Sequence, residues 1–383
     1  MTISRRSFFH QCAVGAISST SISMGTGGAP FSGGILSSEE GKTTWPIRLD
    51  NNENAYGPSQ KTMAAMKESL PLANRYPGAA CQELAESIAN LHKTNVENVI
   101  LGCGSSEILR MVAAASLGPR KKLVVASPTF DLIAEEAKRL NAEVISVPLT
   151  KVYTHNLNAM LAKIDGQTGL VYICNPNNPT GGLTPRRELE NFLHSLPPKI
   201  PVVIDEAYYD YVVEAVSEPS FLDRPLADDR LIVIRTFSAM HGLAGLRVGY
   251  AIAGVQMARK LAAIRLAYGV NIVAAKAAVA ALQDSEYVRA CRQRNADDHQ
   301  EFLNVANARM LRVLESHTNF VMLKAERHWQ EVVEHFGKNN ILLGPLVPSM
   351  YGYVRISLGT PDEMKEFWRV WDLMPFRPHK MEM

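Results

Sequence analysis

Short apolar runs that alternate with helix-like segments constrain the fold of this chain more than any other feature. The runs are mostly continuous in apolar residues, without a regular alternation of apolar and polar positions. The runs are Asn98–Leu101, Leu123–Ala126, Glu143–Val147, Leu170–Cys174, Val202–Ile204 and Leu231–Ile234. Helical patterns lie between them at Gln82–Leu91, Leu132–Leu140 and Arg187–Leu193. Buried strands of this kind are typical of a mostly parallel sheet that helices cover on both faces.

The pattern changes toward the C-terminus. A long helical stretch begins near Asn271, and two later strands are predicted at Asn319–Leu323 and Tyr353–Ser357. We therefore expect an α/β protein with a three-layer α/β/α large domain at residues 61–275 and a smaller α+β domain at residues 276–383. Residues 31–60 are predicted to form an extended arm that ends in the turn around Gly57-Pro58.

The first thirty residues have the character of a targeting segment. Arg5-Arg6 precedes a modestly apolar run from Cys12 to Met24 that is rich in small residues. This pattern predicts a twin-arginine export signal over residues 1–30, and hence a periplasmic protein. A disordered arm with a chance pair of arginines, in a cytoplasmic protein, is the alternative.

Composition excludes several classes of partner. The 383 residues carry 40 basic and 38 acidic side chains, a formal net charge of +2, without a long block of one sign, so nucleic acid is not expected to bind. No internal stretch reaches the roughly 18 apolar residues that span a bilayer, so no membrane partner is expected after signal removal. The 5 cysteines lack metal-type spacing, so we predict neither a metal site nor a disulfide framework.

A glycine-rich turn follows the first predicted strand. Gly102-Cys103-Gly104 leads into Ser105-Ser106 at the start of a predicted helix. Backbone N–H groups at such a helix start can bind an anion, which makes this turn a candidate phosphate site. A simple capped turn is the alternative.

Polar residues also follow two later strands. Asn175 to Gly181 includes Asn178 and two prolines that restrict the backbone, directly after the strand that ends at Cys174. The next strand ends at Asp205, with Tyr208 three positions on. Ligands of open α/β folds bind at the carboxyl ends of strands, and a buried aspartate needs a cation or several donors. A structural aspartate that caps the following segment is the alternative reading.

One more segment follows these motifs in the chain: Ser238-Ala239-Met240-His241-Gly242-Leu243-Ala244-Gly245-Leu246-Arg247. The order of the motifs, with this segment last, is similar to that of a known enzyme family. From about Arg48 to Thr360 the chain resembles the fold-type I aminotransferases of classes I and II, which depend on pyridoxal 5'-phosphate (PLP). It most closely resembles the histidinol-phosphate aminotransferase branch. In that family a lysine that holds PLP as a Schiff base stands at the position of Ala239.

The resemblance implies roles for individual residues. Ser105 and Ser106 are expected to contact the phosphate through backbone and hydroxyl, and Ser238 and Arg247 to complete the phosphate site. The PLP ring would be contacted by Asn178 and Tyr208 at its oxygen, by Asp205 at its pyridine nitrogen and by Phe130 through stacking. Asp205 and Tyr208 would also serve catalysis, because they tune the ring. Tyr56 would reach the phosphate of a neighbouring subunit, which implies a homodimer with shared sites.

The resemblance also bears on the substrate. Arg355, on a predicted apolar strand, would bind the α-carboxylate of an amino acid, assisted by Asn319. In the histidinol-phosphate branch an arginine usually follows the strand that corresponds to Ile341–Leu343, but here Gly344-Pro345 follows. A cation for the substrate phosphate is therefore missing, which favours a free amino acid and a 2-oxo acid as substrates.

With alanine at position 239, the chain is expected to keep the residues that bind PLP but to lack the lysine that turnover requires. The sequence predicts an aminotransferase that moves an amino group from an amino acid to a 2-oxo acid, in a lysine-less form that is nearly inactive. His241 is read as a packed or solvent-facing histidine, not as a replacement base. Whether Ala239 is an engineered or a natural residue stays open. A PLP-dependent lyase, decarboxylase or racemase and a non-catalytic binder of PLP or amino acids are the alternatives.

Overall fold

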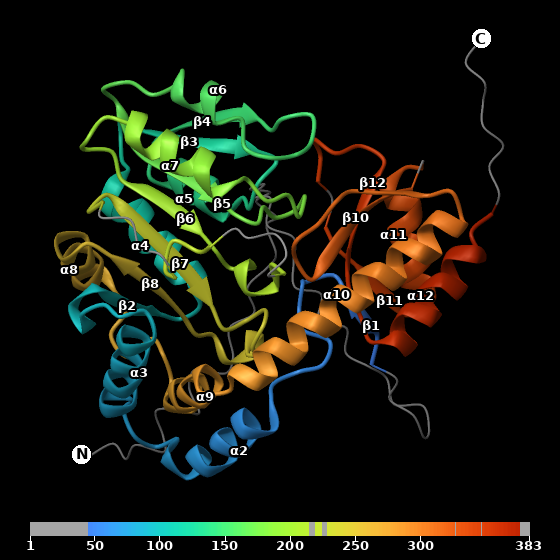
Figure 1. Ribbon diagram of the computed structural model, residues 1–383, viewed down its shortest axis with the longest axis horizontal. Helices are drawn as coiled ribbons and strands as arrows, with labels where there is room; N and C mark the ends of the chain where they lie inside the picture. Colours follow the sequence, from blue (N-terminus) through green and yellow to red (C-terminus); the bar gives the residue numbers. More distant parts are fainter. Residues whose placement is uncertain (1–44, 214–218, 224–227, 326, 346, 376–383) are drawn as a thin grey trace, which may run out of the picture. The chain divides into compact units, whose positions relative to one another are not determined.

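The computed structural model describes residues 45–213, 219–223, 228–325, 327–345 and 347–375 (Figure 1). The predicted export signal and residues 31–44 of the predicted arm lie outside the described residues. From Trp45 onward the described chain forms one compact unit. No helix in these ranges is long and apolar enough to cross a membrane.

A seven-stranded sheet forms the centre of the molecule, in the order β2-β8-β7-β6-β5-β3-β4. Its strands are β2 (Val99–Gly102), β3 (Lys122–Ser127), β4 (Glu143–Pro148), β5 (Thr168–Cys174), β6 (Val202–Asp205), β7 (Leu231–Thr236) and β8 (Gly249–Ala253). All neighbours are parallel except β8, which runs antiparallel to both β2 and β7. The predicted mostly parallel sheet is confirmed, although β8 was not among the predicted strands.

Helices cover both faces of this sheet, as the continuous apolar strands predict. Along β5, Leu170, Tyr172 and Cys174 face one core, and Val171 and Ile173 face the other. The first face is covered by α4 (Ser105–Ser116), α5 (Leu132–Arg139) and α8 (Val255–Ile264). The second is covered by α3 (Gly78–Leu91), α6 (Leu157–Leu161), α7 (Arg186–Ser195) and α9 (Ile272–Leu282). The three-layer α/β/α arrangement is therefore confirmed.

A second, smaller sheet lies beside the three-layer α/β/α part of the molecule (Figure 1). Its antiparallel strands are β9 (Arg312–Val313), β10 (Phe320–Lys324) and β12 (Tyr353–Ser357), and a separate parallel pair joins β1 (Ile47–Leu49) to β11 (Ile341–Leu343). Helices α10 (Ser285–Ala308), α11 (Trp329–Lys338) and α12 (Pro361–Asp372) pack on these strands. This part confirms the expected smaller α+β unit. The boundary at residue 275 stays a prediction.

Side-chain caps divide the long helical stretch that was expected from Asn271. Asn271 accepts from Ala274 N–H at 2.8 Å and starts α9, and Asp284 accepts from Tyr287 N–H at 3.3 Å and starts α10. The stretch is thus two helices because Asp284 offers a new N-cap. The remaining short elements are α2 (Gln60–Ser69), η1 (Leu70–Leu72), η2 (Val96–Asn98), η3 (Tyr209–Tyr211) and η5 (Ala244–Leu246).

The capping box of α12 gives a first testable prediction. Thr360 N–H donates to Glu363 Oε2 at 2.7 Å, and Glu363 N–H donates to Thr360 Oγ1 at 3.4 Å. Thr360→Ala should lower the free energy of unfolding by about 1 kcal/mol, because one N-terminal donor loses its acceptor. Urea denaturation would measure the change. Thr360→Ser, which keeps the hydroxyl, should unfold near the wild-type midpoint, and an equal loss in both variants would contradict a capping role.

Candidate active site

The predicted site residues converge at the carboxyl ends of three neighbouring strands. Asn178 follows β5, Asp205 ends β6, and Ala239 follows β7. Because these strands are adjacent and parallel, their following loops leave the same edge of the sheet. The structure thus brings together motifs that lie tens of residues apart in the chain.

A cradle for an anion forms at the start of α4. Gly104 has a φ of 72°, and a Cβ there would collide with the guanidinium of Arg247. A Cβ on Gly249 would lie 2.6 Å from Ser105 N, so the backbone of β8 also touches this helix start. Both glycines therefore permit close approach of Arg247 and the free N–H groups of α4.

Ser238 lies next to the same helix start. Thr236 Oγ1 donates to Ser238 Oγ at 2.9 Å, and Thr236 is paired with Gly249 across the sheet. Arg247 is exposed, and its Nη1 donates to the carbonyl of Ala244 at 2.8 Å. The four predicted phosphate ligands thus meet around one helix N-terminus that carries a partial positive charge.

Asp205 is a buried carboxylate whose contacts come from neutral groups. Tyr172 OH donates to Asp205 Oδ2 at 2.9 Å, and Ala207 N–H donates to Oδ1 at 3.1 Å. Burial raises the pKa of Asp205 to about 6, against the lowering effect of these two bonds. No cationic side chain of the described residues contacts this carboxylate.

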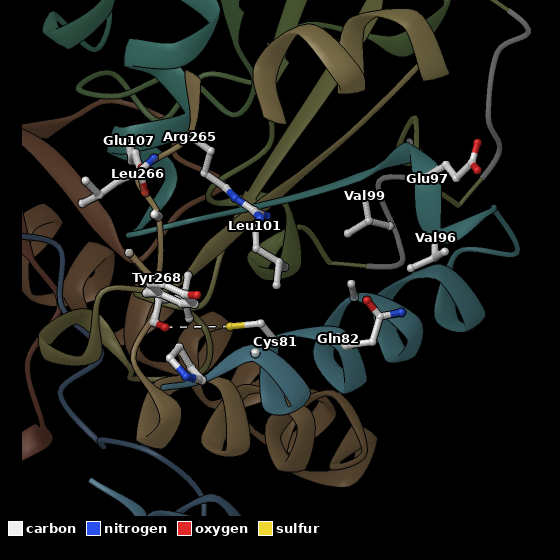
Figure 2. Close-up of a pocket in the computed structure, with 16 residues that line it drawn as sticks. Cys81, Gln82, Val96, Glu97, Val99, Leu101, Glu107, Arg265, Leu266 and Tyr268 are labelled. Atoms are coloured by element: carbon white, nitrogen blue, oxygen red, sulfur yellow. Dashed lines mark hydrogen bonds between the residues drawn. The ribbon is translucent and has the colours of Figure 1, made fainter. Parts of the chain in front are cut away.

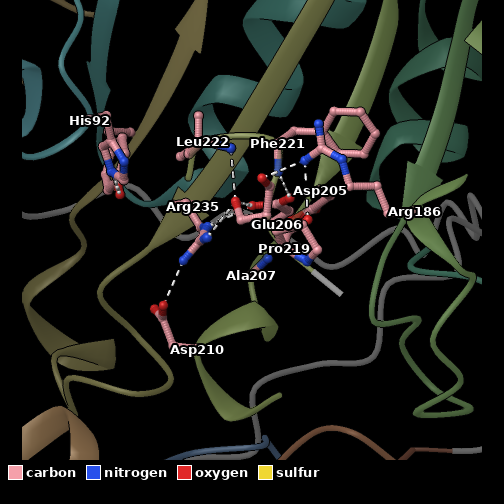
Figure 3. Close-up of polar contacts among 12 residues, drawn as sticks. His92, Arg186, Asp205, Glu206, Ala207, Asp210, Pro219, Phe221, Leu222 and Arg235 are labelled. Carbon is pink, nitrogen blue, oxygen red and sulfur yellow. Dashed lines mark hydrogen bonds and ion pairs between the residues drawn. The ribbon is translucent and has the colours of Figure 1, made fainter. Parts of the chain in front are cut away.

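The adjacent carboxylate, Glu206, is in the opposite situation (Figure 3). Arg235 Nε donates to Glu206 Oε2 at 2.9 Å, and Arg235 Nη1 pairs with Asp210 Oδ1 at 2.6 Å. Ser220 Oγ also donates to Glu206 Oε2, at 2.5 Å. Glu206 is therefore satisfied within the protein, whereas Asp205 retains capacity for a cationic ligand.

Hydrogen bonds connect Tyr208 to the segment after β1 and to the loop after β5. Its hydroxyl accepts from Asn52 Nδ2 at 2.9 Å and from Asn178 Nδ2 at 3.4 Å. Burial raises the pKa of Tyr208 to about 12, so the hydroxyl keeps its proton at neutral pH. Asn178 Oδ1 in turn accepts from Arg355 Nη1 at 2.9 Å. The predicted ring contacts and the predicted carboxylate ligand therefore form one connected group.

Arg355 is held in place by hydrogen bonds from both of its Nη atoms. Its Nη2 donates to the carbonyl of Asp50 at 2.7 Å, while its buried Nε has no partner among the described residues. Asn319 donates through Nδ2 to the carbonyls of Asn52 and Glu53, at 2.9 and 3.1 Å, and its buried Oδ1 likewise lacks a described partner. Unmet polar groups at this depth are costly, which is typical of a ligand site.

Ala239 and His241 both lie in the loop after β7. Ala239 is 4% exposed and belongs to an apolar cluster with Tyr211, Met240 and Cys291, against which Tyr208 packs. His241 is buried, its ring lies 5.2 Å from that of Phe237, and burial lowers its pKa. These contacts agree with the reading of His241 as a packed histidine.

The last two predicted residues have local contacts. Phe130 is half-buried and packs against the core that contains α5. Tyr56 OH donates to Asp298 Oδ2 at 2.8 Å, and its ring lies 4.3 Å from the Arg294 guanidinium, both in α10 of the same chain. The stacking role of Phe130 and the intersubunit role of Tyr56 stay predictions.

Sequence reasoning missed three contributors. Tyr172 lies inside the fully buried strand β5, and its hydroxyl donates to Asp205. Asn52 binds Tyr208 from the N-terminal arm. Glu107 accepts from Cys103 N–H at 2.5 Å and from Leu266 N–H at 2.9 Å. A hydroxyl two residues before the end of a buried strand was the available signal for Tyr172. Tyr208, the partner of Asn52, and Leu266, one of the two partners of Glu107, lie more than 150 residues away, so no local signal indicated these two contacts.

The described structure also contains a cavity of about 490 Å³ (Figure 2). It is bounded by α3, β2 and the segment that joins α8 to α9, and Cys81 Sγ contacts the carbonyl of Val270 at its wall. Glu107 lines it, but none of the predicted site residues does. The cavity is therefore separate from the strand-end cluster.

Comparison with known proteins decides the family. The sequence profile of aminotransferase class I and II matches residues 45–370. This chain belongs to that family. Curated relatives of this aminotransferase include the histidinol-phosphate aminotransferase of Moorella thermoacetica, which is 35% identical over 326 residues, 84% of each chain. Histidinol-phosphate aminotransferase 2 of Carboxydothermus hydrogenoformans is 36% identical over 323 residues, 84% of this chain and 88% of its own.

Solved structures agree with the fold of the aminotransferase. The histidinol-phosphate aminotransferase of Sinorhizobium meliloti, crystallised with PLP, superposes with a TM-score of 0.79 at 23% identity, over 86% of this chain and 90% of its own. A Thermus thermophilus aspartate aminotransferase mutant superposes with a TM-score of 0.74 at 20% identity, over 85% and 96% of the two chains. The family uses PLP, and the fold-type I architecture is confirmed.

Proposed function

We propose that this protein binds PLP and an α-amino acid in the strand-end cluster, and that with alanine at position 239 it transfers amino groups very slowly. The observation that carries the proposal is the buried Asp205, which has only neutral partners and a pKa raised to about 6. A protonated pyridine nitrogen is the cation that such a carboxylate would bind.

The other residues fit the rest of PLP. The phosphate would lie at the N-terminus of α4 beside Arg247 and Ser238, where glycines at 104 and 249 leave room. The ring oxygen would accept from the donors around Asn178 and Tyr208. When bound, PLP supplies an electron sink that lowers the cost of removing the α-proton of an amino acid. Asp205 would keep the pyridine nitrogen protonated, and Tyr208 would hold the ring in register.

Alanine at position 239 leaves the described site without the family's proton carrier. A positioned acid–base group contributes roughly 10²–10⁴-fold to a reaction rate. We therefore expect tight, noncovalent cofactor binding together with very low turnover. A binder of PLP and amino acids without turnover is the second candidate function, and the buried, apolar surroundings of Ala239 favour it.

The substrate is proposed to be an amino acid and not a phosphate ester. Arg355 offers a planar guanidinium with an uncommitted Nε, which suits one carboxylate. Gly344 lies against Arg355, because a Cβ on it would be 3.0 Å from Arg355 Nε. An arginine at position 344 would therefore require Arg355 or the local backbone to shift, and the glycine there supplies no second cation, although the curated relatives above are named histidinol-phosphate aminotransferases.

Arg355→Gln tests the assignment. We expect the affinity of the PLP-loaded protein for amino acids to fall by about 10–100-fold, because a charge-assisted contact to the carboxylate is lost. PLP affinity itself should stay within about threefold, since Arg355 contacts the substrate. Absorbance titrations with PLP and then with amino acids would measure both constants.

Arg369→Gln is the matched control, because Arg369 pairs with Glu366 on the exposed surface of α12. It should leave both constants unchanged. A wild-type protein that binds no PLP would refute the proposed function. A normal affinity of Arg355→Gln for amino acids would refute only the substrate assignment.

Two further proposals concern the state of the protein in the cell. A homodimer in which Tyr56 reaches the partner's phosphate site would be detected by light scattering and by weaker PLP binding of Tyr56→Phe.

Export through the twin-arginine route would be detected by cell fractionation. The variant that combines Arg5→Lys with Arg6→Lys should stay in the cytoplasm.

A further inference from the structure

Arg355 is the arginine that we assign to the substrate carboxylate. The groups that interact with it electrostatically are two carboxylates, Asp50 and Asp131, and the hydroxyl of Tyr208. Burial lowers the pKa of Arg355, whereas Tyr208, Asp50 and Asp131 raise it. Asp50 is itself paired with Arg48, at 3.2 Å. Asp131, the other carboxylate that interacts electrostatically with Arg355, makes no close ion pair with any of the described residues.

The side chain of Asp131 forms no structural contact that would account for an aspartate at this position. It stands at the N-cap position of α5, where aspartate normally accepts from a backbone N–H. Its side chain makes no such capping bond. It also makes no other hydrogen bond or ion pair within the described ranges, and it is exposed. The carboxylate is therefore free to meet a ligand.

The loop that carries Asp131 belongs to the rim of the proposed site. Asn177 Nδ2 donates to the carbonyl of Pro128 at 3.1 Å, and Thr129 Oγ1 donates to Asn177 Oδ1 at 2.7 Å. Asn177 is next to Asn178, which holds Arg355. The loop after β3 is thus fixed, through one short segment, to the carboxylate-binding arginine.

Two tyrosines lie at the same rim. Tyr353 and Arg355 are two residues apart on β12, so both side chains point to one face of that strand. The Tyr353 ring lies 6.5 Å from that of Tyr153, edge to face. Tyr153 is in the loop after β4, which leaves the sheet beside the loop of Asp131, because Ser127 at the end of β3 pairs with Pro148 at the end of β4.

From these contacts we infer that Asp131, with the rings of Tyr153 and Tyr353, selects amino-acid substrates whose side chain carries a positive charge. The inference rests on the proposed function and names the substrate class of that site. Arg355 would bind the α-carboxylate, and a terminal ammonium or guanidinium would meet Asp131 and the aromatic faces. Acidic side chains would be repelled by Asp131.

Three amino acids of similar length test the inference. Lysine carries a terminal ammonium, norleucine a methyl group and 2-aminoadipate a carboxylate. The PLP-loaded wild-type protein should bind lysine about fivefold more tightly than norleucine, and 2-aminoadipate more weakly than either. Asp131→Asn should reduce the ratio of lysine to norleucine affinity to about one, without changing the affinity for PLP.

Glu135→Gln is the matched control, because Glu135 is an exposed carboxylate in the first turn of the same helix. It should keep the wild-type ratio. Equal or better binding of norleucine, or an unchanged ratio in Asp131→Asn, would overturn the inference and leave the proposed function intact. Failure of all three amino acids to bind the PLP-loaded protein would overturn the proposed function and the inference together.

Discussion

Replacing Ala239 with lysine is expected to raise the rate of amino-group transfer by at least about 10²–10⁴-fold, the contribution of one positioned acid–base group. The gain in rate should be larger if the imine between the lysine and PLP also reacts faster with the amino group of the substrate than free PLP does. The residues around position 239 already have their partners, so a lysine would join a formed site. Borohydride reduction and intact mass would detect PLP bound to the lysine, and a coupled assay would measure transfer.

Ala239→Met is the matched control for this experiment. It adds an unbranched side chain to the same buried position but no amine. It should neither retain PLP after reduction nor gain activity. If Ala239→Lys retains PLP but transforms no amino acid, the non-catalytic binder becomes the better description. If a product other than a 2-oxo acid forms, a lyase, decarboxylase or racemase is indicated.

Asp205→Asn is expected to have two opposite effects. The cofactor-free variant should be more stable than wild type at pH 7, because burial disfavours the charged carboxylate. The pKa of Asp205 rises from 3.8 to about 6, a shift of about two units that corresponds to about 3 kcal/mol. PLP affinity should fall by about 10–100-fold, because the pyridine nitrogen loses its anionic partner.

The pH dependence has a definite sign. A carboxyl group with a raised folded-state pKa binds more protons in the folded protein than in the unfolded one between about pH 4 and pH 6. Its contribution to the stability of the cofactor-free protein is therefore greatest at low pH and is lost as the pH rises through this window. The difference in unfolding free energy between wild type and Asp205→Asn should grow over the same window, as measured by denaturant titration at a series of pH values.

Glu206→Gln, at the neighbouring position, should change the stability of the protein in the opposite direction from Asp205→Asn. Its partner Arg235 is buried and would lose a charged acceptor, so the variant should be less stable by about 1–3 kcal/mol. PLP affinity should stay close to that of wild type. If Asp205→Asn proves less stable than wild type at pH 7 and keeps its PLP affinity, Asp205 is a structural residue and the assignment fails.

Most of the fold could be predicted because its signals are local. A strand such as β5 is buried throughout and mostly apolar, since both of its faces are covered. The predicted and observed bounds of β12 are identical. The pairing of β1 with β11 joins segments nearly 300 residues apart and left no local pattern, and β8 was not recognised as the antiparallel member of the large sheet.

The sequence by itself determined the alternation of the predicted buried strands with helices, the residue types at the strand ends and the absence of lysine at position 239. These are properties of single positions and short periods. Only the tertiary structure decided that Asp205 has neutral partners while Glu206 has Arg235, and that Arg355 is held by Asn178 and Asp50. The physical reason is that burial and hydrogen-bond partners come from distant segments, and these set whether a carboxylate is satisfied or available to a ligand.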